Sequence, residues 1–395
     1  MSENYDLAVI GSGPGGYVCA IRAAQLGLNV ICIDKRGAHG GTCLNVGCIP
    51  SKALLHASEV YHETKSSSSM GINVDNVSIN LQDMMNYKEE GISGNVKGID
   101  FLFKKNKVES VYGIAKILSS NQINIKLNDG SEKLIEAKNI VIATGSESAS
   151  LNGIEIDEEK IVSSTGALSL EKIPEHLTII GGGYIGLELG SVWSRLGSKV
   201  TVIEYLDRIA PGLDGELSSE FQKILKRQGI EFIVGAKVTG VEEKSDGLSV
   251  QIENVSSGEI STLDSSVVLV STGRIPNTIG LFDDDLGIQL NEKGFIKTDK
   301  NYRTDVEGVW AIGDVIEGPM LAHKAEEEGV AVAELIKGKP GHVNYNIIPS
   351  VIYTNPEVAS VGLTEDQLNE SGTGYKVGKF PFLANGRAKV NKATD

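Results

Sequence analysis

The sequence predicts an α/β protein built on two Rossmann-like dinucleotide-binding domains. A strand, a glycine-rich loop and an apolar-periodic helix follow one another near the N-terminus, and the same three elements recur later in the chain. The spacing within the two copies is the same, because Gly11 and Asp34 are 23 residues apart, as are Gly181 and Glu204. A repeat with preserved spacing indicates two dinucleotide sites rather than a chance glycine-rich turn.

Length and composition narrow the class of protein. The chain has 395 residues, enough for two or three domains, and 41% of them are hydrophobic. A formal net charge of −15 argues against nucleic acid and anionic membranes as partners, since both require basic patches. Four cysteines are too few for a disulfide scaffold, and no signal peptide or membrane-spanning run is evident. We expect a cytoplasmic protein without a metal site.

The first copy of the repeat follows a buried strand at Leu7–Ile10. Its loop has the pattern G-x-G-x-x-G, with glycines at Gly11, Gly13 and Gly16. Glycines in this pattern let the backbone approach a pyrophosphate at the N-terminus of the following helix. Asp34, at the end of the second strand, is placed to accept a hydrogen bond from a ribose hydroxyl.

The second copy repeats the loop with Gly181, Gly183 and Gly186. Its acid is Glu204, which can accept hydrogen bonds from a free ribose 2′-hydroxyl and repels a 2′-phosphate. Arg208 lies nearby but beyond the acid. The second site is therefore expected to prefer NAD over NADP.

Two cysteines, Cys43 and Cys48, lie in a glycine-rich segment after the first copy. Pro50 suits the first turn of a helix that Ser51–Tyr61 can continue. A cysteine at a helix N-terminus is stabilised as a thiolate, and Cys48 is the better placed of the two. A thiolate beside a second thiol can exchange with a substrate disulfide or dithiol. On the spacing of the two cysteines alone, two unrelated buried thiols are as good an interpretation as a redox pair.

The segment GGTCLNVGCIPSK at residues 40–52 resembles the redox-active disulfide segment of the flavoprotein disulfide reductases. The likeness extends over nearly the whole chain and is greatest for the branch whose members reoxidise dihydrolipoyl groups. Residues 204–212 favour this branch over the glutathione and mercuric reductases, which remain alternatives within the family. A catalytically impaired nucleotide-binding protein is the alternative from another class.

The resemblance implies that an NAD-binding domain is inserted into the FAD-binding domain. The expected boundaries are 1–147 and 274–344 for the two parts of the FAD-binding domain and 148–273 for the NAD-binding domain. Residues 345–395 resemble the opening of an α+β dimerisation domain, which is incomplete here. Members of this branch are expected to be homodimers.

The resemblance also assigns the site residues. Cys43 is the interchange thiol and Cys48 the thiolate nearer the flavin, while Lys52 pairs with Glu188 beside the flavin ring. The residues expected to bind FAD or NAD are Gly11, Gly13, Pro14, Gly16, Asp34, Lys35, Gly41, Thr42, Lys52, Gly113, Thr144, Gly145, Ser146, Gly181, Gly183, Tyr184, Ile185, Gly186, Glu188, Glu204, Val238, Gly273, Arg274, Gly313, Asp314, Met320, Leu321, Ala322 and His323.

Three of these positions have specific expected roles. Asp314 is expected to bind the ribityl chain of FAD, and the backbone of Gly113 is expected to meet the adenine. His323 could be interpreted as a general acid or base, but the resemblance implies instead that it lines the cofactor. The other histidines have no evident pairing or metal-ligand spacing and are assigned no role.

The implied reaction converts a dihydrolipoyl group and NAD into a lipoyl group and NADH, on the lipoyl domains of 2-oxo acid dehydrogenase complexes. The attacking dithiol needs a general base because thiol pKa values lie above neutrality. In the family this base is a histidine, oriented by a glutamate, from the partner subunit, and no residue of this sequence matches it. Residues 1–395 alone are therefore expected to turn over lipoyl substrates poorly while still binding FAD and NAD.

Overall fold

The computed structural model describes residues 3–395, and the chain divides into two compact units. The first unit consists of Met1–Pro50, Tyr87–Ser148 and Arg274–Ile348. The second consists of Ser51–Asn86, Ala149–Gly273 and Pro349–Asp395. Each unit contains its own sheet with a parallel core, and the predicted α/β class is confirmed.

The sheet of the first unit contains β1 (Glu3–Tyr5), β2 (Leu7–Ile10), β3 (Val30–Asp34), β4 (Glu109–Ser119), β5 (Gln122–Leu127), β6 (Glu132–Ala137), β7 (Ile140–Ile142) and β18 (Val309–Ala311). Their order is β1-β6-β5-β4-β3-β2-β7-β18. The strands from β4 to β18 in this order run parallel, and β4, β5 and β6 form an antiparallel meander. The buried apolar runs of β2, β3 and β7 are typical of strands covered on both faces.

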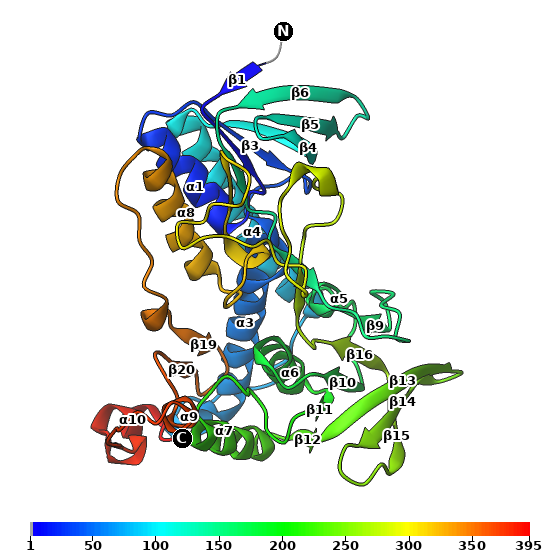
Figure 1. Cartoon of the computed structure of the whole chain (residues 1–395). Helices are drawn as coiled ribbons and strands as arrows, with labels where there is room; N and C mark the ends of the chain where they lie inside the picture. The colour runs from blue at the N-terminus through cyan, green and yellow to red at the C-terminus, as the bar shows by residue number, and fades with distance from the viewer. Residues whose placement is uncertain (1–2) are drawn as a thin grey trace. The chain divides into compact units, whose positions relative to one another are not determined.

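Helices α1 (Pro14–Gln25) and α8 (Ala322–Ile336) lie side by side in the first unit (Figure 1). Their close approach depends on two glycines. A Cβ on Gly15 would lie 3.0 Å from the carbonyl oxygen of Ala325, and a Cβ on Gly329 would lie 2.5 Å from the carbonyl oxygen of Gly15. Side chains at these positions would therefore push the two helices apart.

The second unit contains five parallel strands in the order β12-β11-β10-β16-β9 (Figure 1). Their bounds are β9 (Ile161–Val162), β10 (His176–Ile180), β11 (Lys199–Glu204), β12 (Ile230–Val234) and β16 (Val267–Val270). Helices α6 (Tyr184–Leu196) and α7 (Gly215–Arg227) follow β10 and β11. A separate antiparallel sheet is formed by β13 (Ala236–Lys244), β14 (Gly247–Asn254) and β15 (Ile260–Ser265).

The two predicted repeats have the same strand register. In the first unit β2 pairs with β3 so that Ile10 lies opposite Ile33. In the second unit β10 pairs with β11 so that Ile180 lies opposite Ile203. The acid that ends β3 or β11 is therefore brought beside the glycine loop that follows the neighbouring strand, β2 or β10. The repeat predicted from spacing is thus confirmed as a repeat in three dimensions.

One predicted helix differs in its bounds from the structure. The predicted helix at Ser51–Tyr61 is longer in the structure, where α3 spans Cys48–Ser66. The other elements are α4 (Leu81–Asn106), α5 (Ser164–Ala167), β8 (Ser146–Ser148) paired with β17 (Arg274–Pro276), β19 (Ser350–Ile352) paired with β20 (Val358–Ser360), α9 (Glu365–Glu370) and α10 (Gly386–Asn391). Within residues 3–395 the structure contains no helix that is both long and apolar enough to span a membrane.

The α1–α8 contact can be tested with one clashing and one open glycine. Gly329→Ala is expected to lower the free energy of unfolding by about 1–3 kcal/mol, because the new Cβ would meet a backbone carbonyl. Gly94→Ala in α4 is the control, because no atom lies within 4 Å of its Cβ position. It should stabilise the protein by about 0.5–1 kcal/mol. Urea denaturation compares the two, and a wild-type midpoint for Gly329→Ala would contradict the close packing.

Candidate active site

The cysteine pair lies on two consecutive helices. Helix α2 (Gly41–Val46) carries Cys43, and α3 begins at Cys48. Gly47 separates the helices and has no room for a side chain, since a Cβ there would lie 2.9 Å from the carbonyl oxygen of Thr42. The start of α3 at Cys48 confirms the predicted placement of this sulfur at the positive end of a helix dipole.

The side chains of Cys43 and Cys48 lie close enough to affect each other's titration. Hydrogen bonding with Cys48, and then burial, raises the pKa of Cys43 above that of an ordinary thiol. Neighbouring thiols lose their protons in two separated steps, because a second thiolate is repelled by the first. The reduced pair is therefore suited to carry one negative charge, the state that attacks a disulfide.

Two residues that no sequence pattern singles out lie in the electrostatic surroundings of Cys43. The hydroxyl of Tyr17 donates to Oε1 of Glu326 at 3.1 Å. Burial, followed by the charge of Glu326, raises the pKa of Tyr17, so its phenol stays a hydrogen-bond donor at neutral pH. Negative charge on either cysteine contributes to raising the pKa of Tyr17. Only their positions in the sequence could have indicated them: Tyr17 directly follows the first glycine loop, and Glu326 lies in the helix that contains His323.

His39 anchors the chain directly before the cysteine segment, although its sequence context suggests no role. Its buried ring contacts Asp100 (Nδ1 to Oδ1, 2.6 Å) and Ser110 (Nε2 to Oγ, 2.6 Å). Asn45 Nδ2 donates to the carbonyl oxygens of His39 (3.0 Å) and Gly41 (2.8 Å). These bonds hold the turn that enters α2 in a defined conformation.

Lys52 and Glu188 form the predicted ion pair within the second unit. Lys52 Nζ lies 2.8 Å from Glu188 Oε2, and Glu188 is only 5% exposed. Ser51 Oγ donates to the same oxygen at 3.0 Å, and the backbone N–H of Tyr353 donates to Glu188 Oε1 at 3.0 Å. Lys52 Nζ also lies 4.4 Å from the centroid of the Tyr353 ring, a cation–π distance. The place of this pair beside a flavin stays a prediction.

The third glycine of each loop closes the loop through a backbone contact. A Cβ on Gly16 would lie 1.8 Å from the carbonyl oxygen of Gly11, and a Cβ on Gly186 would lie 2.3 Å from that of Gly181. Neither position can hold a side chain without opening the turn. The two loops share this closure, as their common spacing predicts.

The middle glycine of each loop faces space instead. Gly13 and Gly183 are the N-caps of α1 and α6, and neither helix has a capping side chain or an acid in its first turn. A Cβ on Gly183 would meet no atom within 4 Å, and a Cβ on Gly13 would meet the Cα of Gly41 at 3.9 Å. A helix N-terminus with uncapped amides and a side-chain-free approach fits the pyrophosphate of a dinucleotide.

Both predicted acids bind the backbone of their own loops. Asp34 Oδ2 accepts from the N–H and the Oγ of Ser12, at 2.7 and 2.6 Å. Glu204 Oε2 accepts from the N–H of Gly182 at 2.7 Å, and its Oε1 accepts from the N–H of Leu206 at 2.8 Å. Each acid therefore ties its loop to the end of the neighbouring strand, β3 or β11. A contact of either acid with a ribose stays a prediction.

Three predicted FAD residues that are distant in the sequence come together in the first unit. Ser146 Oγ donates to Asp314 Oδ2 at 2.6 Å. Arg274 Nε donates to Ser146 Oγ, and its Nη2 donates to the Ser146 carbonyl, both at 2.7 Å. Burial lowers the pKa of Arg274, and the charge of Asp314 opposes this effect. The chain of bonds orients the Asp314 carboxylate.

Most of the other predicted cofactor residues lie at or near the ends of elements, and Gly113 lies within β4. Thr144 Oγ1 donates to the carbonyl of Asn277 at 2.7 Å. The rest are Pro14 at the start of α1, Lys35 after β3, Gly41 and Thr42 in α2, Gly113 in β4, Gly145 before β8, Tyr184 and Ile185 at the start of α6, Val238 in β13, Gly273 before β17, and Met320, Leu321, Ala322 and His323 at or before the start of α8. Their contact with a cofactor stays a prediction.

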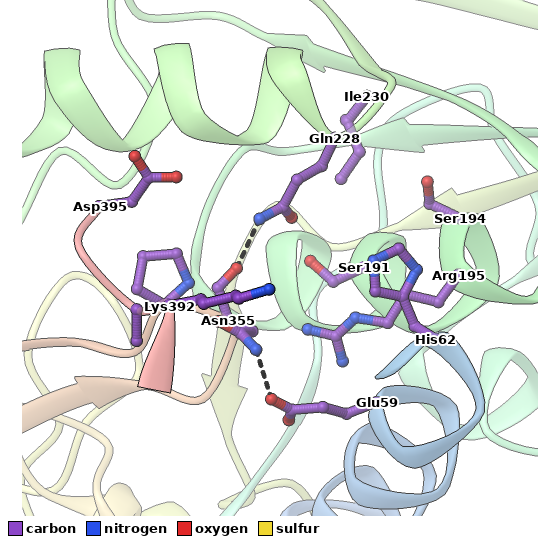
Figure 2. A pocket seen from close by; sticks show the side chains of 12 residues that line it. Glu59, His62, Ser191, Ser194, Arg195, Gln228, Ile230, Asn355, Lys392 and Asp395 are labelled. Atoms are coloured by element: carbon purple, nitrogen blue, oxygen red, sulfur yellow. Dashed lines mark hydrogen bonds between the residues drawn. The ribbon is translucent and has the colours of Figure 1, made fainter. Parts of the chain in front are cut away.

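A pocket in the second unit is lined by none of the predicted site residues. Figure 2 shows the side chains that line it. Gln228 Nε2 donates to the carbonyl of Asn355 at 2.6 Å, and Asn355 Nδ2 donates to Glu59 Oε1 at 2.5 Å. The lining residues are Glu59, His62, Ser191, Ser194, Arg195, Gln228, Ile230, Asn355, Pro356, Lys392, Ala393 and Asp395. Within the described part of the chain, no three or more His, Cys, Asp or Glu side chains are grouped to hold a metal ion.

The contacts of Glu188 can be measured through three variants. Glu188→Ala removes the acceptor of three donors and is expected to lower the free energy of unfolding by about 1–3 kcal/mol, with Lys52 kept partly solvated by its 35% exposure. Tyr353→Leu, which loses the cation–π contact, should cost about 0.5–1 kcal/mol. Tyr353→Phe keeps both the ring and the backbone N–H and is the control. Equal urea midpoints for the two Tyr353 variants would rule out a cation–π contribution.

Comparison with known proteins agrees with the geometry of the site. Residues 5–329 match the family described as pyridine nucleotide-disulphide oxidoreductase, and residues 348–395 match the dimerisation domain of that family. A solved structure of an HOCl-induced flavoprotein disulfide reductase from Escherichia coli, in complex with Cu(II), has a TM-score of 0.87 at 27% identity. That likeness covers 100% of this chain and 85% of the other.

Curated relatives are closer in sequence. The mitochondrial dihydrolipoyl dehydrogenase of Pisum sativum is 54% identical over 390 residues, which cover 98% of this chain and 78% of the relative. Dihydrolipoyl dehydrogenase 3 of Pseudomonas putida is 53% identical, over 100% of this chain and 84% of the relative. The paired glycine loops, the cysteine segment and these likenesses lead to one conclusion: the chain belongs to the pyridine nucleotide-disulphide oxidoreductase family.

Proposed function

We propose that this chain serves the NAD-dependent oxidation of protein-bound dihydrolipoyl groups, for which it supplies the cysteine pair and the two dinucleotide sites. The observation that carries the proposal is the Cys43–Cys48 pair on consecutive helices, in a chain 54% identical to a dihydrolipoyl dehydrogenase. The net reaction converts a dihydrolipoyl dithiol and NAD⁺ into a lipoyl disulfide, NADH and a proton. The proposed partners are the lipoyl domains of 2-oxo acid dehydrogenase complexes and a second copy of the chain, and the proposed compartment is the cytoplasm.

The cysteine pair accounts for the thiol chemistry of this reaction. A thiolate of the substrate attacks the sulfur of Cys43 in the Cys43–Cys48 disulfide, and Cys48 leaves as a thiolate. The second thiol of the substrate then displaces Cys43 from the mixed disulfide. The substrate has become a disulfide, and its two electrons reside in the cysteine pair. The start of α3 at Cys48 stabilises the leaving thiolate.

Members of this family use FAD and NAD, and the first unit of this chain fits FAD. FAD, when bound, supplies electron transfer between a dithiol and a nicotinamide. The uncapped start of α1 at Gly13 would hold the pyrophosphate, and Asp34 would hold the adenosine ribose. Asp314, oriented by Ser146 and Arg274, would hold the ribityl chain.

The second unit fits NAD rather than NADP. Glu204 places a carboxylate where a 2′-phosphate would add a second negative charge. Arg208, the nearest cation after Glu204 in the sequence, has its Nη1 3.0 Å from Asp366 Oδ2. Its charge is therefore already directed at a carboxylate in this structure.

The two loops can be tested separately, because each has a middle glycine with open space. Gly183→Ala is expected to weaken NADH binding about tenfold or more while leaving the melting temperature unchanged, since its Cβ meets no protein atom within 4 Å. Gly13→Ala is the matched control and should reduce the flavin content rather than the affinity for NADH. NADH fluorescence titration and visible absorbance measure these effects. Wild-type NADH affinity in Gly183→Ala would remove α6 from the NAD site.

The redox role of the cysteines is tested by anaerobic reduction. The purified protein should be yellow, and two-electron reduction with NADH should produce a long-wavelength absorption band that NADPH produces poorly. Cys43→Ser and Cys48→Ser should both lose the dithiol–disulfide chemistry, and with it the reduction of lipoamide. They should still oxidise NADH with an artificial acceptor, because that reaction bypasses the cysteine pair. A colourless wild-type protein, or lipoamide reduction by either variant, would overturn the proposed function.

A further inference from the structure

Helix α8 contains a lysine and a glutamate that are completely buried. Lys324 and Glu328 lie one helical turn apart, both side chains are 0% exposed, and Nζ lies 3.0 Å from Oε1. Burying a charge is costly unless it is paired and hydrogen-bonded. A buried ion pair is often no more stable than apolar residues of similar volume. Stability alone therefore gives no reason for these two residue types.

Both charged groups bind the backbone of one residue, Gly313. Lys324 Nζ donates to the Gly313 carbonyl at 3.0 Å, and the Gly313 N–H donates to Glu328 Oε2 at 2.7 Å. Gly313 has φ +77° and begins the short helix η3 (Gly313–Val315), in which Asp314 is the next residue. Its amide and carbonyl are thus both held by charge-assisted bonds, which are stronger than neutral ones.

Glu328 is also bound by a residue from the end of the first unit. Tyr345 OH donates to Glu328 Oε1 at 2.6 Å and lies 3.3 Å from the hydroxyl of Tyr302. Burial, followed by the hydrogen bond to Glu328, raises the pKa of Tyr345, so the phenol remains a donor at neutral pH. The buried carboxylate therefore has three donors: an ammonium, a backbone amide and a phenol.

We propose that Lys324 and Glu328 are positioning residues for the Asp314 turn and that tight FAD binding depends on them. Ser146 orients the Asp314 side chain, whereas Lys324 and Glu328 fix the backbone from which that side chain extends. The inference rests on the proposed function, because it assumes that Asp314 contacts the flavin cofactor. It extends that function to two residues that would not touch the cofactor themselves.

A double variant separates this role from a structural one. Lys324→Met and Glu328→Gln each leave a buried charge or donor without its partner, so both should melt earlier and bind FAD more weakly. Lys324→Met combined with Glu328→Leu leaves no unpaired buried charge, so its melting temperature should fall only by the cost of the polar partners that Gly313 and Tyr345 lose. Gly313 would then lack both partners, and the Kd for FAD should rise about 10- to 100-fold. FAD fluorescence titration of the deflavinated protein measures this, alongside its melting temperature.

Controls make the outcomes distinct. Glu334→Gln breaks the Arg22–Glu334 pair (2.6 Å) at the other end of α8 and should leave FAD affinity unchanged. A wild-type protein that does not bind FAD would overturn the proposed function. A wild-type protein that binds FAD, with a double variant of equal affinity, would overturn only the positioning role.

If the double variant does not fold, Glu328→Asp decides the question. This change keeps the charge for Lys324 but shortens the reach of the carboxylate to the Gly313 N–H by one methylene. Weaker FAD binding in a folded Glu328→Asp protein is the expected result, and wild-type FAD affinity would overturn the proposal.

Discussion

The structure depends most on a close backbone contact within each dinucleotide loop, which leaves no room for a side chain. In each dinucleotide loop the third glycine lies against the carbonyl of the first, at Gly16 on Gly11 and Gly186 on Gly181. This contact lets a helix begin immediately after β2 or β10. The amides at the helix start then point along the helix axis without a capping side chain. The acid at the end of β3 or β11 holds the loop in place. Pyrophosphate recognition follows from this construction rather than from any one side chain.

Buried charge is the second theme of the molecule. Glu188 and Glu328 are both carboxylates inside the protein, and each is bound by one ammonium, one backbone amide and one hydroxyl. Desolvating a carboxylate is tolerated when several donors replace the lost water. The hydrogen bonds of such a group fix the position of the carboxylate and the positions of its donors. In this way Glu188 fixes the position of Lys52, and Glu328 fixes the position of Gly313 beside Asp314.

Much of the fold could be predicted from the sequence, because the repeated loops and the cysteine segment are local patterns with a physical reason for each glycine. The partners of buried polar groups could not be predicted in the same way. Tyr353 binds Glu188 from 165 residues away, and no periodicity indicates that contact. In α8, residues 326, 327 and 328 are all glutamate, yet only Glu328 is buried. Which glutamate faces inward is decided by tertiary packing, which the sequence pattern does not record.

The need for glycine at fixed positions of the two loops restricts how proteins of this construction can evolve. A glycine that must contact a carbonyl cannot be exchanged, so mutation has almost no way to adjust the part of the site that holds the phosphates. Adaptation to a different nucleotide must instead occur at the end of β11 and just after it, at residues 204–208 in the second unit. Those residues lie between the buried part of β11 and helix α7. A lineage can therefore change its cofactor through a handful of substitutions while the folding core stays as it was.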